Sequence, residues 1–135
     1  MSNEDLFNFC EEWLAAWTGN QPEKLITFYS EDALYVDPEH RDGLRGHEEI
    51  LPYFRKLLAV YHDWEWHPVE VFPIDAGMIV KWECTIRVNE EVLNEVGLDI
   101  VELQNHKISR NEVYFDRTRL IAAVRKSKRS HRLNY

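Results

Sequence analysis

The protein has 135 residues, a mass of 16.2 kDa, 44% hydrophobic residues and a formal net charge of −8. This content of apolar residues suits one folded domain and excludes intrinsic disorder for most of the sequence. Two cysteines are too few for a disulfide-stabilised fold, and no apolar run approaches the ~20 residues of a membrane span. The first residues are acidic where a secretory signal is basic, so we expect a soluble, cytoplasmic protein.

The charge is distributed unevenly. Residues 117–135 hold seven basic residues and no acid, whereas residues 1–116 hold nine basic and 24 acidic residues. Because an acidic body repels phosphate backbones, we do not expect nucleic acid as a partner. We expect residues 1–118 to form the domain. Residues 119–135 are expected to form a basic tail that lies in solvent or docks on that domain.

Two helices are predicted near the N-terminus. Ser2 and Asp5 have the spacing of a capping box. Apolar residues at helical spacing follow and predict a helix over residues 3–18, which Gly19 ends. A short second helix begins at Pro22, a residue favoured in the first helical turn.

The middle of the sequence combines a strand, a loop and a third helix. Residues 33–37 are predicted to form a short strand, and the polar residues 39–46 are predicted to form a loop. An apolar stripe predicts the third helix over residues 47–61, where the early Pro52 delays or kinks it.

From Trp64 the hydrophobic period changes from helical spacing to two, which predicts a four-stranded meander. The strands are expected over residues 64–72, 78–88, 95–103 and 107–117, with turns at 75–77 and 104–106 and a polar link at 89–94. Three helices followed by this meander indicate an α+β fold in which helices cover one face of a curved, mainly antiparallel sheet.

Several chemistries are excluded by the residues available. The five glycines form no phosphate-binding loop, and no serine lies in a nucleophile elbow. The six histidines lack metal-ligand spacing, so we expect neither a metal nor another cofactor. Cys10 and Cys84 occupy apolar positions and are expected to act as small buried hydrophobes.

The remaining candidates are two aspartates in apolar surroundings. Asp37 ends a strand before Pro38, where a turn aspartate commonly accepts backbone N–H groups. Asp99 lies within a strand, and alternation places it either on the core face beside Val101 or on the opposite face, with Leu98 in the core. A buried carboxyl without a cation tends to stay protonated, so the first arrangement would place an acid/base group inside the protein.

Motifs distributed over residues 3–118 resemble those of a known superfamily. They are Phe28 to Ala33, Val36-Asp37-Pro38, Gly43 to Gly46, Gly97-Leu98-Asp99 with Lys107-Ile108, and Tyr114-Phe115-Asp116. Their order and spacing are similar to the nuclear transport factor 2-like superfamily, and within it to the SnoaL-like proteins, relatives of ketosteroid isomerase and polyketide cyclases. The resemblance implies a cone-shaped α+β barrel, an apolar pocket between helices and sheet, and a homodimer.

The resemblance also implies roles for individual residues. Asp37 matches the general base of ketosteroid isomerase, and Asp99 matches its protonated, hydrogen-bond-donating aspartic acid. The tyrosine donor of that enzyme falls on Trp13, whose indole offers a single, less acidic N–H. Steroid isomerisation is therefore not expected. Epoxide hydrolases of the superfamily use an arginine between two carboxylates, and we expect no arginine on the inner face.

Two interpretations of the function follow. In the first, the domain is a cofactor-independent enzyme, isomerase-like or polyketide-cyclase-like, in which Asp37 or Asp99 moves a proton on a small, largely apolar carbonyl compound. In the second, the pocket only binds a small apolar molecule, or the domain is a dimeric scaffold.

Ten side chains are predicted to converge on one cavity, unless large aromatic rings fill the cone. They are Trp13, Trp17, Phe54, Leu58, Trp82, Asp99, Val101, Asn111, Val113 and Phe115. Burial is expected to raise the pKa of Asp99 far above its usual value, while water and backbone donors favour ionised Asp37. A homodimer is expected to use the outer sheet face, which carries Lys81, Glu83, Thr85, Arg87, Arg110, Glu112, Tyr114 and Asp116.

Overall fold

The computed structural model describes residues 1–133, with side chains described up to Ser127. The helical elements are α1 (Asn3–Ala15), α2 (Pro22–Leu25), the 3-10 turn η1 (Ile26–Phe28), α3 (Gly46–Val60) and α4 (Thr118–Leu133). The strands are β1 (Tyr29–Asp37), β2 (His40–Arg45), β3 (Glu65–Ile74), β4 (Gly77–Val88), β5 (Glu91–Gln104) and β6 (Lys107–Tyr114). No helix among the described residues is both long enough and apolar enough to cross a membrane.

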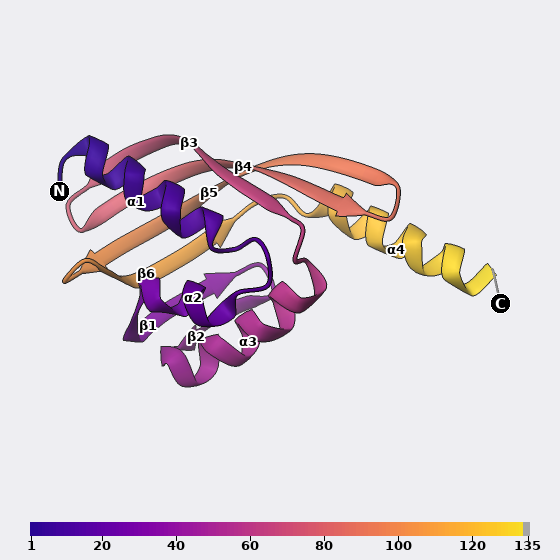
Figure 1. The fold of residues 1–135 in the computed structure, drawn as a ribbon, viewed down its shortest axis with the longest axis horizontal. Coiled ribbons are helices and arrows are strands. Elements are labelled where there is room, and N and C mark those ends of the chain that lie inside the picture. The colour runs from indigo at the N-terminus through magenta and orange to yellow at the C-terminus, as the bar shows by residue number, and fades with distance from the viewer. Residues whose placement is uncertain (134–135) are drawn as a thin grey trace.

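The six strands form one curved sheet in the order β2-β1-β6-β5-β4-β3. All neighbours are antiparallel except β1 and β6, which are parallel. Helix α1 lies across β3, and α3 packs on β1 and β2 (Figure 1). The α+β fold with helices on a mainly antiparallel sheet is confirmed, although the cone stays open because β2 and β3 do not pair.

The first helix begins as predicted and ends early. Ser2 and Asp5 form a capping box, in which the Ser2 hydroxyl accepts from the Asp5 backbone N–H and the Asp5 carboxylate accepts from the Ser2 N–H. The helix ends at Ala15 instead of residue 18. Gly19 then reverses the backbone with a positive φ of 89°, and its N–H donates to the His62 carbonyl at 2.7 Å.

The predicted loop at residues 39–46 is wrong, because residues 40–45 form the edge strand β2. The Asp37 carboxylate accepts the backbone N–H groups of Glu39 and His40, each at 2.9 Å, and so closes a tight β1–β2 turn. A polar segment pairs here because an edge strand exposes its side chains to water.

The predicted link at residues 89–94 is also wrong. A tight turn at Asn89 and Glu90 joins β4 directly to β5, which begins at Glu91. Asn89 takes a positive φ of 54°, a conformation that asparagine tolerates better than most residues. Because the turn is so short, β4 pairs with β5 along the whole length of β4, and the two strands extend beyond the rest of the sheet (Figure 1).

The basic C-terminal segment, for which the sequence pattern predicted no secondary structure, forms helix α4. Leu120 and Ala123 are buried against β4 and β5. The Lys126 Nζ lies 2.9 Å from Glu91 Oε1, and the Arg119 Nε lies 3.7 Å from Glu95 Oε1. The first half of α4 therefore docks on the acidic domain through apolar packing and ion pairs.

The core lies between the helices and the inner sheet face. Its largest fully buried side chains are Trp13, Trp82, Tyr29, Phe54, Leu25, Ile50, Met78, Ile86, Ile108, Val80, Val101 and Asn111. Alternation along β4 is as predicted, because Val80, Trp82, Cys84 and Ile86 are all buried on the inner face.

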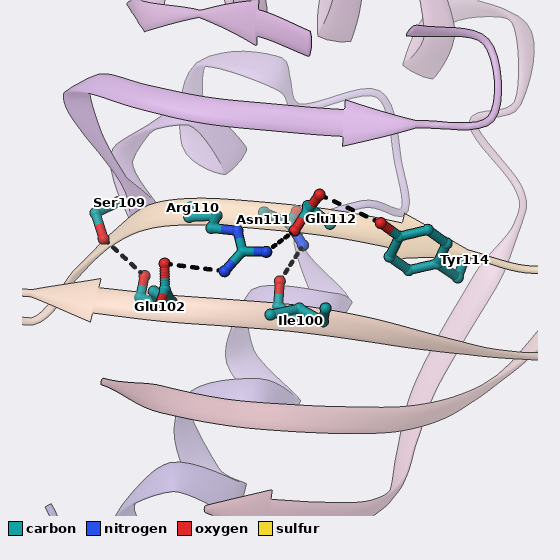
Figure 2. A network of polar contacts seen from close by, with 7 residues as sticks. All are labelled: Ile100, Glu102, Ser109, Arg110, Asn111, Glu112 and Tyr114. Atoms are coloured by element: carbon teal, nitrogen blue, oxygen red, sulfur yellow. Dashed lines mark hydrogen bonds and ion pairs between the residues drawn. The ribbon is translucent and has the colours of Figure 1, made fainter. Parts of the chain in front are cut away.

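The outer sheet face carries a polar network and exposed apolar side chains. Arg110 on β6 contacts Glu102 on β5 and Glu112 on its own strand, and the Tyr114 hydroxyl donates to Glu112 (Figure 2). Leu98 projects from β5 and is 45% exposed.

Candidate functional site

A cavity of about 90 Å³ opens between helices α1 and α3 and the inner sheet face. Its walls are mainly aromatic and aliphatic, with acidic groups and one arginine. The lining residues are Leu14, Trp17, Tyr35, Asp37, Pro38, Glu39, Tyr53, Leu57, Leu58, Tyr61, Trp64, Trp66, Trp82, Asp99, Val113, Phe115 and Arg117. This volume is smaller than roughly 150 Å³, the size of a cavity that takes up benzene, because aromatic rings fill much of the cone. The space that remains suits a small ligand.

The structure brings six of the ten predicted cavity residues to this wall, together with Asp37. The six are Trp17, Leu58, Trp82, Asp99, Val113 and Phe115. The other four, Trp13, Phe54, Val101 and Asn111, do not line the cavity and are fully buried in the core. Trp13 thus does not occupy the place of a tyrosine donor at the pocket, because its Nε1 donates to Tyr29 Oη at 3.2 Å.

Asp99 lies on the inner face and is 3% exposed, while its neighbour Leu98 is on the outer face. Trp82 Nε1 donates to Asp99 Oδ1 at 2.8 Å, and Asn111 Nδ2 donates to Oδ2 at 3.0 Å. Gly97 makes this arrangement possible because a Cβ there would lie 2.2 Å from the Trp82 ring. The aspartate is therefore held by two donors inside an apolar wall.

Burial is the main cause that raises the pKa of Asp99 to about 7; the hydrogen bonds from Asn111 and Trp82 oppose this rise, and the negative charge of Asp37 adds to it. Burial disfavours the charged carboxylate because little water remains to solvate it. A carboxyl with a pKa near neutrality is present in both protonation states at neutral pH and is suited to give and take protons.

Asp37 accepts four hydrogen bonds at the other side of the cavity. Its Oδ2 accepts from Tyr35 Oη at 3.0 Å and from Tyr53 Oη at 2.5 Å, and its Oδ1 accepts from the backbone of Glu39 and His40. A carboxylate has about four lone-pair sites, so these donors occupy all of them. Taking a proton would require Asp37 to give up one of these bonds.

The tyrosines of this network were missed from the sequence although signals were present. Tyr35 shares a strand face with Asp37, two residues away. Tyr53 lies three residues after Ile50 and four before Leu57, on the apolar stripe of α3. Burial raises the pKa of both phenols well above the usual value, and Asp37 adds to this, so both remain donors at neutral pH.

An arginine lines the cavity, against expectation. Arg117 follows β6, and its Nη1 lies 3.1 Å from Glu39 Oε1. The predicted strand over residues 107–117 is too long, because β6 ends at Tyr114. Alternation along that predicted strand already puts Arg117 on the face of Val113 and Phe115, so the expectation of no inner arginine overlooked this signal. Trp64 is a second missed wall residue, and its buried indole N–H has no hydrogen-bond partner among the described residues.

Other titratable groups offer little chemistry. Among the side chains that the structure describes, up to Ser127, no three His, Cys, Asp or Glu groups gather in a way that could hold a metal ion. Burial raises the pKa of the Cys10 thiol to about 12 and that of Cys84 still further, and nearby carboxylates add to both effects. Both thiols therefore stay neutral and unreactive at neutral pH.

Comparison with known proteins identifies a family that matches this sequence. The sequence model of the SnoaL-like domain matches residues 10–111. No curated protein matches the sequence.

Solved structures share the fold at low sequence identity. A hypothetical protein with a ketosteroid isomerase-like fold from Catenulispora acidiphila DSM 44928, in complex with trimethylamine, has a TM-score of 0.72 and 18% identity, covering 83% of this chain and 88% of that one. AclR, a putative hydroxylase from Streptomyces galilaeus, has a TM-score of 0.74 and 11% identity, covering 93% and 98%. TerC, co-crystallised with polyporic acid, has a TM-score of 0.71 and 15% identity, covering 84% and 92%.

Proposed function

Because the protein belongs to the SnoaL-like domain family, we propose that its cavity binds a small, largely apolar carbonyl compound and that Asp99 exchanges a proton with it. The observation that carries this proposal is a 3% exposed carboxyl in an aromatic cavity wall, with a pKa that burial raises to about 7. This chemistry is isomerase-like or cyclase-like and relies on the side chains alone.

The two aspartates have different roles in this proposal. Ionised Asp99 removes a proton from the carbon beside the carbonyl, and protonated Asp99 returns it to the same or a neighbouring carbon. Asp37 is a less suitable base because four donors already occupy its lone pairs. It instead orients the Tyr53 hydroxyl. This assignment moves the role of the base to Asp99 from Asp37, the residue that the resemblance to ketosteroid isomerase implied for it.

The developing negative charge on the carbonyl oxygen needs a hydrogen-bond donor. We assign this role to the indole N–H of Trp64, which is buried in the cavity wall without a partner among the described residues. An unpaired buried donor costs about 1–3 kcal/mol, which a ligand oxygen would recover. A fixed donor in an apolar site stabilises an oxyanion more than the same donor in water does.

Exchange of α-protons tests the proposal without knowledge of the natural substrate. Acetone, cyclopentanone and cyclohex-2-enone are incubated with the protein in D₂O, and loss of α-protons is followed by NMR. We expect the protein to accelerate exchange of at least one ketone, with a rate that rises with pH through about 7 as Asp99 ionises. Asp99→Asn should lower the protein-dependent rate by about 100-fold or more.

The matched control is Asp75→Asn, because Asp75 is exposed in the β3–β4 turn, away from the cavity. It should exchange protons at the wild-type rate. Exchange that is unchanged in a folded Asp99→Asn variant would exclude Asp99 as the base. Absence of protein-dependent exchange for all three ketones would favour a binding function instead.

A second candidate function is binding of a small alkylammonium ion. Eight aromatic side chains surround the cavity with three carboxyl groups and one arginine, a composition that favours a cation. The rings are Trp17, Tyr35, Tyr53, Tyr61, Trp64, Trp66, Trp82 and Phe115. The similar structure from Catenulispora acidiphila was crystallised in complex with trimethylamine, which supports this candidate.

Tetramethylammonium and the uncharged tert-butanol, which have the same number of heavy atoms, separate this candidate from simple apolar binding. Four tryptophans line the cavity, so their fluorescence reports its occupancy. This candidate function requires that tetramethylammonium quench the fluorescence saturably. The ion should bind more tightly above pH 7 than below, because ionised Asp99 attracts the cation. Equal responses to both molecules would contradict it.

A further inference from the structure

A buried network runs behind the cavity wall and ends on Asp99. Trp13 Nε1 donates to Tyr29 Oη at 3.2 Å, and Tyr29 Oη donates to Asn111 Oδ1 at 2.8 Å. Asn111 Nδ2 then donates to Asp99 Oδ2 at 3.0 Å. Each of the four side chains is at most 3% exposed, so no water competes for these bonds. The network connects α1, β1, β6 and β5.

Each hydrogen bond in this network fixes the direction of the next. The Trp13 indole has a donor and no acceptor, so Tyr29 Oη accepts from it and directs its own hydrogen toward Asn111. The Asn111 amide oxygen accepts that hydrogen, which leaves the amide nitrogen facing Asp99. The Tyr29 hydroxyl therefore favours this orientation of the amide from the Trp13 end of the network, and a long hydrogen bond of 3.5 Å from Asn111 Nδ2 to the Ile100 carbonyl favours it as well.

This orientation affects which form of Asp99 is favoured. With the nitrogen of Asn111 facing it, Asp99 Oδ2 receives a hydrogen bond that stabilises the carboxylate. Without the Tyr29 hydroxyl, only the long 3.5 Å hydrogen bond to the Ile100 carbonyl opposes a turn of the Asn111 amide, after which its oxygen would accept a hydrogen bond from the protonated acid. The Tyr29 hydroxyl thus affects a carboxyl that it does not touch.

We propose that Tyr29 is a positioning residue for Asp99: its hydroxyl, directed by the Trp13 indole, holds the Asn111 amide in the orientation that favours the ionised carboxylate. The inference rests on the proposed function in taking Asp99 as the proton-exchanging group. It adds two residues outside the cavity, Tyr29 and Trp13, to the determinants of the pH at which the site acts.

Other titratable groups also face Asp99 or the cavity and must be held constant. Cys10 from α1 is close enough for charge to act between it and Asp99. On β1, the charge of Asp37 raises the pKa of Asp99, and the charge of Asp99 raises the pKa of Tyr35. Tyr53, Tyr61, Glu39 and Arg117 are the other titratable groups in the cavity wall. A Tyr29→Phe change removes none of these groups.

Titration of the Asp99 carboxyl by ¹³C NMR in Tyr29→Phe and Tyr35→Phe tests the proposal. Both tyrosines are 2% exposed, but Tyr35 donates to Asp37 and not to the network. Tyr29→Phe should raise the Asp99 midpoint by about one pH unit, a tenfold change in proton affinity, whereas Tyr35→Phe should change it much less. Equal shifts in both variants, or no shift in Tyr29→Phe, would overturn the proposal.

Trp13→Phe is the second variant and keeps the test decisive if Tyr29→Phe fails to fold. It removes the first donor, so the Tyr29 hydroxyl is free to rotate, and it should shift the Asp99 midpoint upward by a smaller amount. An unchanged or lowered midpoint in folded Trp13→Phe would also overturn the proposal.

The titration needs no substrate, so the two proposals fail separately. If Asp99 responds to Tyr29→Phe while no ketone exchanges protons, the positioning role stands and the proposed function falls. If ketone exchange requires Asp99 but its titration ignores Tyr29→Phe, the positioning role falls and the proposed function stands.

Discussion

Asp37 and Asp99 both line the cavity and are held in opposite ways. Asp37 accepts four hydrogen bonds, two of them from backbone N–H groups of the β1–β2 turn. Asp99 accepts two, from Trp82 and Asn111, and is otherwise surrounded by apolar groups. The first arrangement leaves Asp37 without a free lone pair, and the second leaves Asp99 as a carboxyl whose protonation changes near neutrality.

This difference predicts how stability depends on pH. The pKa of Asp99 is raised to about 7 in the folded state from a usual value of 3.8, so the folded protein binds more protons than the unfolded chain between these values. Stability from this group is therefore lost as pH rises from about 4 to 7. The loss amounts to about 4 kcal/mol at most, at about 1.4 kcal/mol for each tenfold change in proton affinity.

Urea unfolding at pH 5 and pH 8 checks this prediction. Asp99→Asn removes the titration, so the variant should gain stability relative to wild type on going from pH 5 to pH 8. The exposed Asp75→Asn change should leave the difference between the two pH values as in wild type. A parallel pH dependence in wild type and Asp99→Asn would mean that Asp99 titrates as it does in the unfolded chain.

Gly97 provides a second prediction at the scale of single residues. A Cβ at this position would lie 2.2 Å from the Trp82 ring, whose indole N–H donates to Asp99. Gly97→Ala should therefore displace Trp82 and cost about 1–3 kcal/mol, as other overpacked core substitutions do. Chemical denaturation measures the loss, and a variant as stable as wild type would show that Trp82 moves aside freely.

The sequence predicted the positions of some of these side chains better than those of others. Alternation predicted that Trp82 lies on the inner face. It did not decide which sheet face holds Asp99, because the neighbouring Leu98 and Ile100 are also apolar. The burial of Asp99 and the exposure of Leu98 decide the question. Trp13 is buried as its helical spacing predicts, but one-dimensional spacing does not reveal that it bonds to Tyr29 rather than facing the cavity.

At the scale of elements, long periodic segments were predicted well and short polar ones were not. The inner face of β4 and the stripe of α3 follow from burial of apolar side chains. Strand β2 was missed because its own residues are mostly polar and show no hydrophobic alternation. It forms because it pairs with β1 after the turn that Asp37 closes. Helix α4 was missed because its charge obscured the few apolar residues, such as Leu120, that dock it.

The docking of α4 predicts different effects for two neighbouring residues. Leu120 is 8% exposed against the β4–β5 hairpin, whereas Ile121 is 37% exposed. Leu120→Ala should lower stability by about 2 kcal/mol, because it removes buried apolar area, and Ile121→Ala should change it by less than about 0.5 kcal/mol. Thermal unfolding of both variants checks this. Equal losses would indicate that α4 does not dock through Leu120.

At the scale of the whole molecule, we propose that two copies associate through the outer sheet face. Register places Leu98 on β5 beside Lys81 on β4 and Tyr114 on β6. Leu98 and Tyr114 are 45% and 52% exposed, and the Arg110 network lies on the same face (Figure 2). Exposed apolar groups among hydrogen-bonding residues are typical of an interface.

Light scattering at micromolar concentration tests this association. Wild type should have about twice the 16.2 kDa mass of one chain. Leu98→Glu should shift the mass toward one chain, because it would bury a charge without a partner. Val60→Glu, at an exposed apolar position at the end of α3 and outside the sheet, should not. A wild-type protein with the mass of one chain would contradict the proposal.

The central claim is that Asp99 is a buried proton-exchanging group, and titration of its carboxyl carbon in the wild-type protein tests this claim most directly. The signal is assigned by its absence in Asp99→Asn. The account predicts a midpoint near pH 7, because burial outweighs the hydrogen bonds from Trp82 and Asn111. A midpoint near 4, the value of an aspartate in water, would contradict it.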